Sequence, residues 1–192
     1  IGGEGNDTFF GWVEGNDTLD GGAGNDTFWV GIQWGGQNGS VPLVANVWGG
    51  LGRDTYSLSS SVYADYQYYV NDFATGTDGD VINISSLLSA SGYTGSTNPF
   101  LSGNPSFQLV QNGADTQLKW DRDGAGGSPA YVVLTLRNTP LNQLTADNFI
   151  SASNTAAMAQ NTISTGMFRV DNPDFSDASP STVTVSYTHL RA

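Results

Sequence analysis

Four aspartates stand in the same local sequence, and this pattern could bind a metal cation. Each follows a glycine by two residues and precedes a large apolar residue by two; they are Asp7, Asp17, Asp26 and Asp54. Closely spaced glycines allow a tight turn whose backbone carbonyls point inward, and the aspartate adds a short charged oxygen ligand. Calcium takes about six to eight oxygen ligands in flexible geometry. Two stacked turns could supply such a set, so the spacing indicates calcium chemistry.

The aspartates belong to an internal repeat of about nine residues. The copies are "GGEGNDTFF" (2–10), "WVEGNDTLD" (12–20), "GGAGNDTFW" (21–29) and, after an insertion, "GGLGRDTYS" (49–57). They fit G-G-x-G-x-D-x-U-x, where U is a large apolar residue, although the second copy has Trp12 and Val13 in place of the glycine pair. The constant apolar position predicts that each copy is a metal-facing turn followed by a short strand whose U side chain enters the interior.

This repeat resembles the nonapeptide of the hemolysin-type, or RTX, calcium-binding proteins. The resemblance implies a parallel β-roll in which two nonapeptides form one coil, so repeats two apart stack on the same side. Asp7 and Asp26 would then share a face, and Asp17 would lie on the opposite one. The ligands implied are the carboxylates of the four aspartates together with the carbonyls or turns of Gly3, Gly5, Gly15, Gly22, Gly24, Gly50 and Gly52. Proteins of this family are exported unfolded by type I secretion and fold where calcium is available.

The alternative interpretation of the repeats is a series of hairpin turns, or an extended linker rich in Asn, Asp and Gly. A single G-x-G-x-D sequence would favour that alternative. Four copies in register, each with an apolar residue two positions after the aspartate, favour a calcium-binding roll instead.

The composition narrows the classes of partner. The 192 residues include 18 acidic and 6 basic side chains, for a net charge of −12. Binding to nucleic acid or to an anionic membrane surface needs basic residues, so both are disfavoured, whereas cation binding fits. No stretch is long and apolar enough to insert into a membrane. The sequence contains no Cys, which excludes disulfides and thiolate metal sites.

Residues 61–150 are predicted to form a mostly antiparallel β segment. "SFQLV" and "TQLKW" flank a turn at "QNGAD" and predict a hairpin, and "AYVVLTL" predicts a strand. The strings "VNDFATGTDGDVINISSLL" (70–88), "DTQLKWDRDGAGG" and "YVVLTLRNTPLNQL" resemble the C-terminal target domain of type I secretion substrates. The resemblance implies a transient contact with the secretion apparatus. The fold class expected for the chain is therefore all-β, a short parallel β-roll followed by a mostly antiparallel segment.

Other aspartates in this segment have two interpretations each. Asp72, with Asp78 and Asp80 nearby, either binds an ion at the junction with the roll or caps a turn. Asp121 and Asp123 in "DRDG" have the Asp-x-Asp-Gly spacing of a calcium loop but lack the distal Glu of an EF-hand. They either bind calcium or form a polar turn with two solvated carboxylates.

The chain divides into five predicted ranges. The roll and the secretion-target-like segment come first, and the roll is expected to be truncated at its N-terminus. A low-complexity linker, the shortened start of a further β module, and a tail that resembles a translated sequencing adapter follow. The roll is expected over residues 1–60, the secretion-target-like segment over 61–150 and the linker over 151–162. The further module is expected over 163–184 and the adapter-like tail over 185–192.

No catalytic residue is predicted. The single histidine, His189, lies in the adapter-like tail, so no histidine serves a zinc site or a Ser-His-Asp triad, and no Cys nucleophile exists. The expected function is a calcium-binding region of a protein exported to the outside or the cell surface of a Gram-negative bacterium. The parent is expected to be an RTX adhesin or surface protein that meets a host or surface ligand through other domains. The alternative parent is a secreted RTX protease or lipase whose catalytic domain lies upstream.

Overall fold

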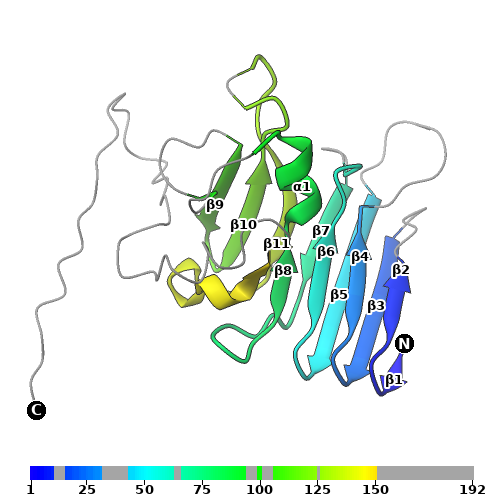
Figure 1. Ribbon diagram of the computed structural model, residues 1–192. Coiled ribbons are helices and arrows are strands. Elements are labelled where there is room, and N and C mark those ends of the chain that lie inside the picture. Colours follow the sequence, from blue (N-terminus) through cyan, green and yellow to red (C-terminus); the bar gives the residue numbers. More distant parts are fainter. Residues whose placement is uncertain are drawn as a thin grey trace, which may run out of the picture.

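A computed structural model describes residues 1–10, 16–31, 43–62, 66–93, 99–100, 106–124 and 126–150. Within these ranges the chain consists mostly of strands, with one α-helix, α1 (Ser85–Ala90), and two 3-10 turns, Leu141–Gln143 and Ala146–Asn148 (Figure 1). The predicted all-β class is therefore confirmed. The strands are β1 (Gly3–Glu4), β2 (Thr8–Phe10), β3 (Asn16–Ala23), β4 (Thr27–Val30), β5 (Leu43–Leu51), β6 (Thr55–Leu58), β7 (Tyr66–Val70), β8 (Val81–Asn83), β9 (Phe107–Asn112), β10 (Asp115–Trp120), β11 (Tyr131–Leu136) and β12 (Phe149–Ile150).

Successive strands of the glycine-rich part alternate between two parallel sheets. β1, β3, β5 and β7 pair in that order in one sheet, and β2, β4, β6 and β8 pair in the other (Figure 1). The register repeats from coil to coil, because Gly3 pairs with Gly22 and Gly22 with Gly50. One coil therefore contains two strands and two turns, which is the arrangement expected of a parallel β-roll.

A stack of aromatic rings fills the space between the two sheets. Phe9 lies on Phe28 with ring centroids 4.8 Å apart, and Phe28 lies on Tyr56 at 5.3 Å. Phe73 ends the stack, tilted against Tyr56 at 5.9 Å. Phe9, Phe28 and Tyr56 occupy the U position of successive coils, and parallel in-register pairing places these equivalent side chains directly above one another. The regular apolar position of the repeat is thus the core of the roll.

The first sheet changes from parallel to antiparallel pairing beyond β11. β11 lies parallel to β7, with Leu136 beside Val70, and β10 and β9 follow as antiparallel neighbours. The predicted hairpin is confirmed: Asn112 faces Asp115 across a turn in which Gly113 has a φ of 62°. β12 pairs with β8 in the second sheet. Both sheets continue across the predicted boundary between residues 60 and 61 through β7 and β8.

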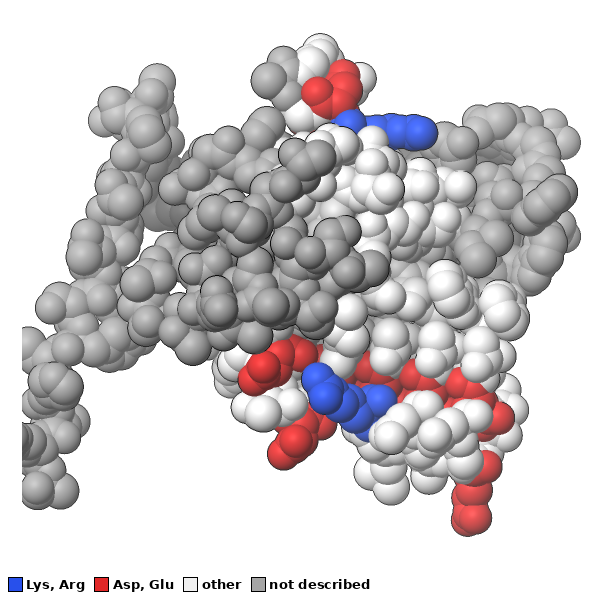
Figure 2. Space-filling model, viewed as in Figure 1, with Lys and Arg blue, Asp and Glu red and all other residues white. Residues whose placement is uncertain are grey.

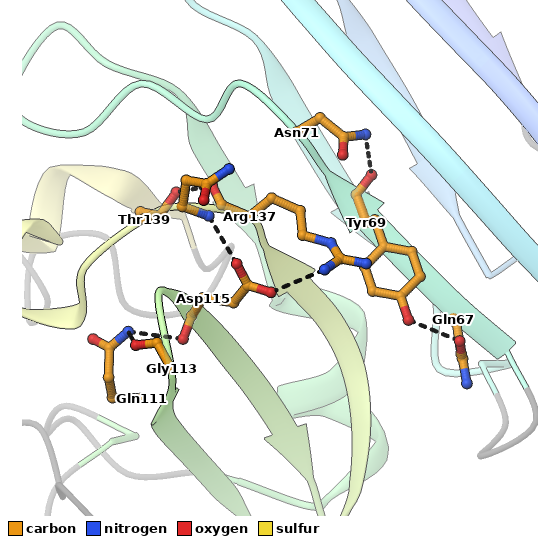
Figure 3. Close-up of polar contacts among 9 residues, drawn as sticks. Gln67, Tyr69, Asn71, Gln111, Gly113, Asp115, Arg137 and Thr139 are labelled. Atoms are coloured by element: carbon orange, nitrogen blue, oxygen red, sulfur yellow. Dashed lines mark hydrogen bonds and ion pairs between the residues drawn. The ribbon is translucent and has the colours of Figure 1, made fainter.

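An arginine on the outside of the first sheet links the parallel and antiparallel parts. Arg137 places its guanidinium 4.0 Å from the centre of the Tyr69 ring and pairs with Asp115 at 3.2 Å (Figure 3). Asp115 also accepts the backbone N–H of Asn138 at 2.9 Å, and the Tyr69 hydroxyl donates to Gln67 at 2.8 Å. Partly exposed ion pairs contribute about 1 kcal/mol or less, so this contact fixes the position of the strands more than it stabilises them.

No helix in the described ranges is long and apolar enough to cross a membrane. The predicted linker 151–162, the further module 163–184 and the adapter-like tail 185–192 lie outside the described residues. The division of the chain into these ranges stays a prediction.

Replacing Phe28 by Ala should lower the free energy of unfolding by about 3–5 kcal/mol, because it removes a buried ring from the middle of the stack. Urea unfolding measured with calcium present would give this value. Phe10→Ala is the matched control, since Phe10 is 60% exposed whereas Phe28 is 1% exposed. The control should change the free energy by about 0.5 kcal/mol or less. Equal losses in the two variants would contradict this assignment of inner and outer faces.

Candidate metal centre

Four aspartates form a column along one end of the roll. Asp7, Asp26 and Asp54 lie in the turns from β1 to β2, β3 to β4 and β5 to β6, and Asp80 directly precedes β8. We call these four residues the aspartate column. Asp7 and Asp26 share a face, as two repeats per coil predict. Asp54 joins them although 28 residues, rather than 19, separate it from Asp26.

One carboxylate oxygen of each later member ties two coils together. The backbone N–H of Asp7 donates to Oδ1 of Asp26 at 2.8 Å, and that of Asp26 donates to Oδ1 of Asp54 at 2.8 Å. The N–H of Asp54 donates to Oδ1 of Asp80 at 2.9 Å. Charge-assisted hydrogen bonds of this kind are stronger than neutral ones. They hold the turns in register and orient each carboxylate.

The second oxygen of three column members has no hydrogen bond. Oδ2 of Asp7, Asp26 and Asp54 is buried and accepts no donor from the described residues. Asp26 is 1% exposed and Asp54 is fully buried. A buried carboxylate oxygen without a partner is costly, so it indicates a ligand. Asp80 differs, because its Oδ2 accepts the backbone N–H of Ala74 at 2.8 Å and leaves no free oxygen.

These free oxygens face a space that only glycine leaves open. A Cβ atom built on Gly2 would meet Oδ2 of Asp7 and the carbonyl oxygen of Gly21, the latter at 2.5 Å. A Cβ atom built on Gly21 would meet Oδ2 of Asp26 and the carbonyl oxygen of Gly49, again at 2.5 Å. A carboxylate from one coil and a carbonyl from the next therefore point into the same small space. This is a cradle of hard oxygen ligands suited to calcium.

The glycines predicted as ligands lie where neighbouring coils stack, rather than beside the free carboxylate oxygens. All six described members have a positive φ: Gly3, Gly5, Gly22, Gly24, Gly50 and Gly52. A Cβ atom on Gly22 would collide with the carbonyl oxygen of Gly3, and one on Gly50 with that of Gly22, so these glycines let the coils stack closely. Gly15, the seventh predicted glycine, lies outside the described residues. Sequence reasoning missed Gly2, Gly21 and Gly49, which the first position of each repeat could have indicated.

The remaining predicted acids lie away from the column. Asp17 is the second residue of β3, at the end of the strand opposite the column, and its in-register neighbour in β5 is Ala45. Asp121 is buried just after β10, and its Oδ1 has no hydrogen bond with any described group, while its neighbour Asp123 is exposed and accepts the Ser128 N–H at 3.4 Å. Burial, and then the hydrogen bond with Asp123, raises the pKa of Asp121.

Asp72, two residues after the end of β7, caps the end of the neighbouring strand β5. Its two oxygens accept the backbone N–H groups of Gly49 at 3.0 Å and Gly50 at 2.9 Å. Both carboxylate oxygens are therefore engaged by backbone N–H groups, and ion binding at Asp72 stays a prediction.

The nonapeptide repeat did not predict that Asp80 belongs to the column. A signal existed, because Asp80-Val81-Ile82 repeats the D-x-U spacing and Ile82 pairs in register with Tyr56. The loop before Asp80 is held by Asn148, a buried residue whose Nδ2 donates to the Asp80 carbonyl at 2.8 Å. The column thus ends in a fully hydrogen-bonded turn.

The column carries negative charge that the described basic residues leave unpaired. Figure 2 shows acidic side chains along the lower edge, where the strands of the roll enter their turns in Figure 1. Arg53 stands beside Asp54 in the sequence but directs its guanidinium to the carbonyls of Gly79 at 3.0 Å and Asp147 at 3.2 Å. Within the described ranges no group of three or more Asp, Glu or His side chains could by itself hold a metal. A cation bound here would therefore need oxygen ligands other than carboxylates, such as the backbone carbonyls of Gly21 and Gly49.

Burial makes the charged form of the column costly. It raises the pKa of Asp54 above the ordinary value, although the Asp26 N–H acts in the opposite direction. It also raises the pKa of Asp80 to about 6, although the N–H groups of Asp54 and Ala74 favour the carboxylate. A bound divalent cation would supply the positive charge that this end of the roll lacks.

Comparisons with known proteins give a weak likeness. No family model matches the chain, and no curated protein matches it. Among solved structures, a similar one is the solution structure of the AlgE6R3 subunit from the Azotobacter vinelandii mannuronan C5-epimerase. The two share 20% sequence identity over 96% of this chain and 94% of that one, with a TM-score of 0.44. Similarity of this degree assigns neither family nor function to the chain.

With calcium removed by a chelator, the chain should gain β structure when the pH falls from about 7.5 to about 5. Asp80 has a folded pKa of about 6 against an ordinary 3.8. The folded state therefore binds the proton more tightly than the unfolded state, and its stability rises as the pH falls through about 6. Circular dichroism would measure the gain, and Asp80→Asn should reduce the pH dependence. Loss of β structure over this range would contradict the prediction.

Proposed function

We propose that this chain is a calcium-binding β-roll that folds when it takes up the metal. The observation that carries the proposal is the set of buried Oδ2 atoms of Asp7, Asp26 and Asp54, which accept no hydrogen bond from described groups. Two of them share their space with the carbonyl oxygen of the next coil, from Gly21 and Gly49. These residues would hold the cation, which would supply charge neutralisation and cross-link adjacent coils.

The ligand chemistry favours calcium over other common cations. Zinc prefers nitrogen and sulfur ligands, and the sequence has no Cys and a single His. Magnesium demands near-ideal octahedral geometry and retains water, whereas calcium accepts a flexible shell of carboxylate and carbonyl oxygens. The cradles beside Gly2 and Gly21 are made of such oxygens.

Coupling to folding follows from the charge and the glycines. Without a cation, the stacked carboxylates repel one another, and the glycines lose much backbone entropy on ordering. A ligand that binds only the folded state stabilises it by about 2.7 kcal/mol at one hundred times its dissociation constant. Several ions along the column would add such contributions. The chain would thus remain loose where calcium is scarce and order where it is plentiful.

We further propose, from the sequence resemblance, that the chain belongs to the RTX proteins and leaves a Gram-negative cell by type I secretion. It would then act outside the cell or at its surface, without catalytic activity of its own. The adhesin or surface-protein parent remains the preferred proposal, and a secreted protease or lipase is the alternative. The support is the repeat itself and the target-domain-like strings in residues 70–88 and after.

Adding about 1 mM calcium to the full chain should increase its β signal in circular dichroism, and a chelator should reverse the change. The double variant Asp7→Asn, Asp26→Asn should shift the calcium midpoint upward by more than about tenfold, because it removes two charged ligands. Asn keeps an oxygen that can accept the N–H of the preceding coil, so the coil contact is retained while the charge is lost.

The matched control is Asp121→Asn with Asp123→Asn, which removes the same charge away from the column. It should shift the calcium midpoint less than the column variant does, because these two residues lie outside the stacked turns. Magnesium at equal concentration should produce a smaller response. A wild-type spectrum that does not change with calcium would refute the proposed function.

A further inference from the structure

The third turn of the roll differs from the first two in the oxygen that accompanies its aspartate. At Gly2 and Gly21, the space beside the carboxylate is shared with a glycine carbonyl from the next coil. At Gly49, the same space is shared by Oδ2 of Asp54 and the hydroxyl oxygen of Tyr56. The hydroxyl lies 2.5 Å from the position that a Gly49 Cβ would take, the same distance as the carbonyl oxygens at the other two turns.

The reason is that the coil after β5 does not repeat the glycine pair. β5 and β7 pair in register up to Val47 and Val70, and the next residues along β7 are Asn71 and Asp72. Asp72 turns its carboxylate onto the N–H groups of Gly49 and Gly50. The three atoms nearest to the position of a Gly49 Cβ are two atoms of the Asp54 carboxylate and the Tyr56 hydroxyl oxygen, so no backbone carbonyl lies as close as at the first two turns. The hydroxyl of Tyr56 takes the equivalent place.

Simple core packing does not account for this hydroxyl. The equivalent residues of the other coils are Phe9 and Phe28, which stack in the same way without a polar atom. Tyr56 is fully buried, and its hydroxyl has no hydrogen bond with any described group. An unpaired buried hydroxyl costs free energy, so Phe would be the better core residue unless the hydroxyl meets a ligand.

We propose that the Tyr56 hydroxyl oxygen is a ligand of a calcium ion at the third turn, together with Oδ2 of Asp54. The phenol keeps its proton and offers a lone pair in place of the missing glycine carbonyl. This assignment rests on the proposed function, since it concerns one position of the same column. It makes the third turn a distinct site, because a neutral hydroxyl replaces the carbonyl used at the first two.

Calorimetric titration of the full chain with calcium, compared between the wild type and Tyr56→Phe, tests the assignment. One site of the variant should bind about tenfold more weakly, the loss expected for a polar contact with a charged group. The remaining sites and the calcium-induced β signal should be retained. Calcium should also perturb the near-ultraviolet tyrosine absorption of the wild type more than that of the variant.

The stability of the same variant, measured in chelator, distinguishes a hydroxyl that binds metal from one that only has a structural role. Without metal, Tyr56→Phe should be at least as stable as the wild type, because it removes an unpaired buried group. Tyr68→Phe is the control, since Tyr68 is a buried tyrosine of the roll whose charged neighbour is Asp17 rather than the column. It should leave every calcium site unchanged.

Two results would overturn the assignment. Identical calcium isotherms for the wild type and Tyr56→Phe would show that the hydroxyl binds no ion. A variant that is less stable in chelator but unchanged in calcium affinity would show that the hydroxyl bonds within the protein. A wild type that binds no calcium would instead refute the proposed function, and this ligand with it.

Discussion

The structure depends on stacking identical turns so closely that their carboxylates must lie one above another. Each coil is joined to the next through a carboxylate oxygen that accepts an aspartate N–H, from Asp26 to Asp7 and from Asp54 to Asp26. This bond fixes the register, but it also brings like charges together in a place from which water is excluded. The stacking is therefore favourable in its hydrogen bonds and unfavourable in its charge. The cation that we propose would resolve the conflict without disturbing the bonds, because it would use only the free second oxygens of Asp7, Asp26 and Asp54.

The far end of the column shows how the chain ends such a stack. Asp80 uses both of its oxygens for backbone N–H groups, and Asp72 does the same for the glycine pair of the third turn. Arg53, where the earlier repeats have asparagine, reaches the carbonyls of Gly79 and Asp147. Each of these side chains replaces a contact that a further repeat would have made. The parallel roll can thus give way to the β9–β11 strands without leaving the described backbone edge uncovered.

The repeat made the core and the shared face of Asp7 and Asp26 predictable, because a fixed spacing in sequence becomes a fixed spacing in a parallel stack. The details at the end of the column were not predictable for the same reason. Asp80 has Asp78 where the repeats have a glycine two residues before the aspartate, so only the D-x-U part of the nonapeptide pattern reaches it. The role of Gly49 and the direction of the Tyr56 hydroxyl depend on which residue the next coil places above them. That is a property of the register between β5 and β7, which a repeat ending at residue 57 cannot reveal.

The two ends of a coil are under unequal constraint. Between Asp26 and Asp54 the chain is longer than one regular coil, yet Thr27 still pairs with Thr55 and Phe28 with Tyr56. In the sequence the extra residues fall between the end of β4 at Val30 and the start of β5 at Leu43, not between β5 and β6, where Asp54 lies. At the column itself a single added atom matters, because a Cβ on Gly21 would meet the Asp26 carboxylate and the Gly49 carbonyl. The number of residues between β4 and β5 can therefore vary without changing how the aspartates of the column stack. For this reason an irregular repeat, with steps of ten, nine and then many more residues, can still build one continuous column of stacked carboxylates.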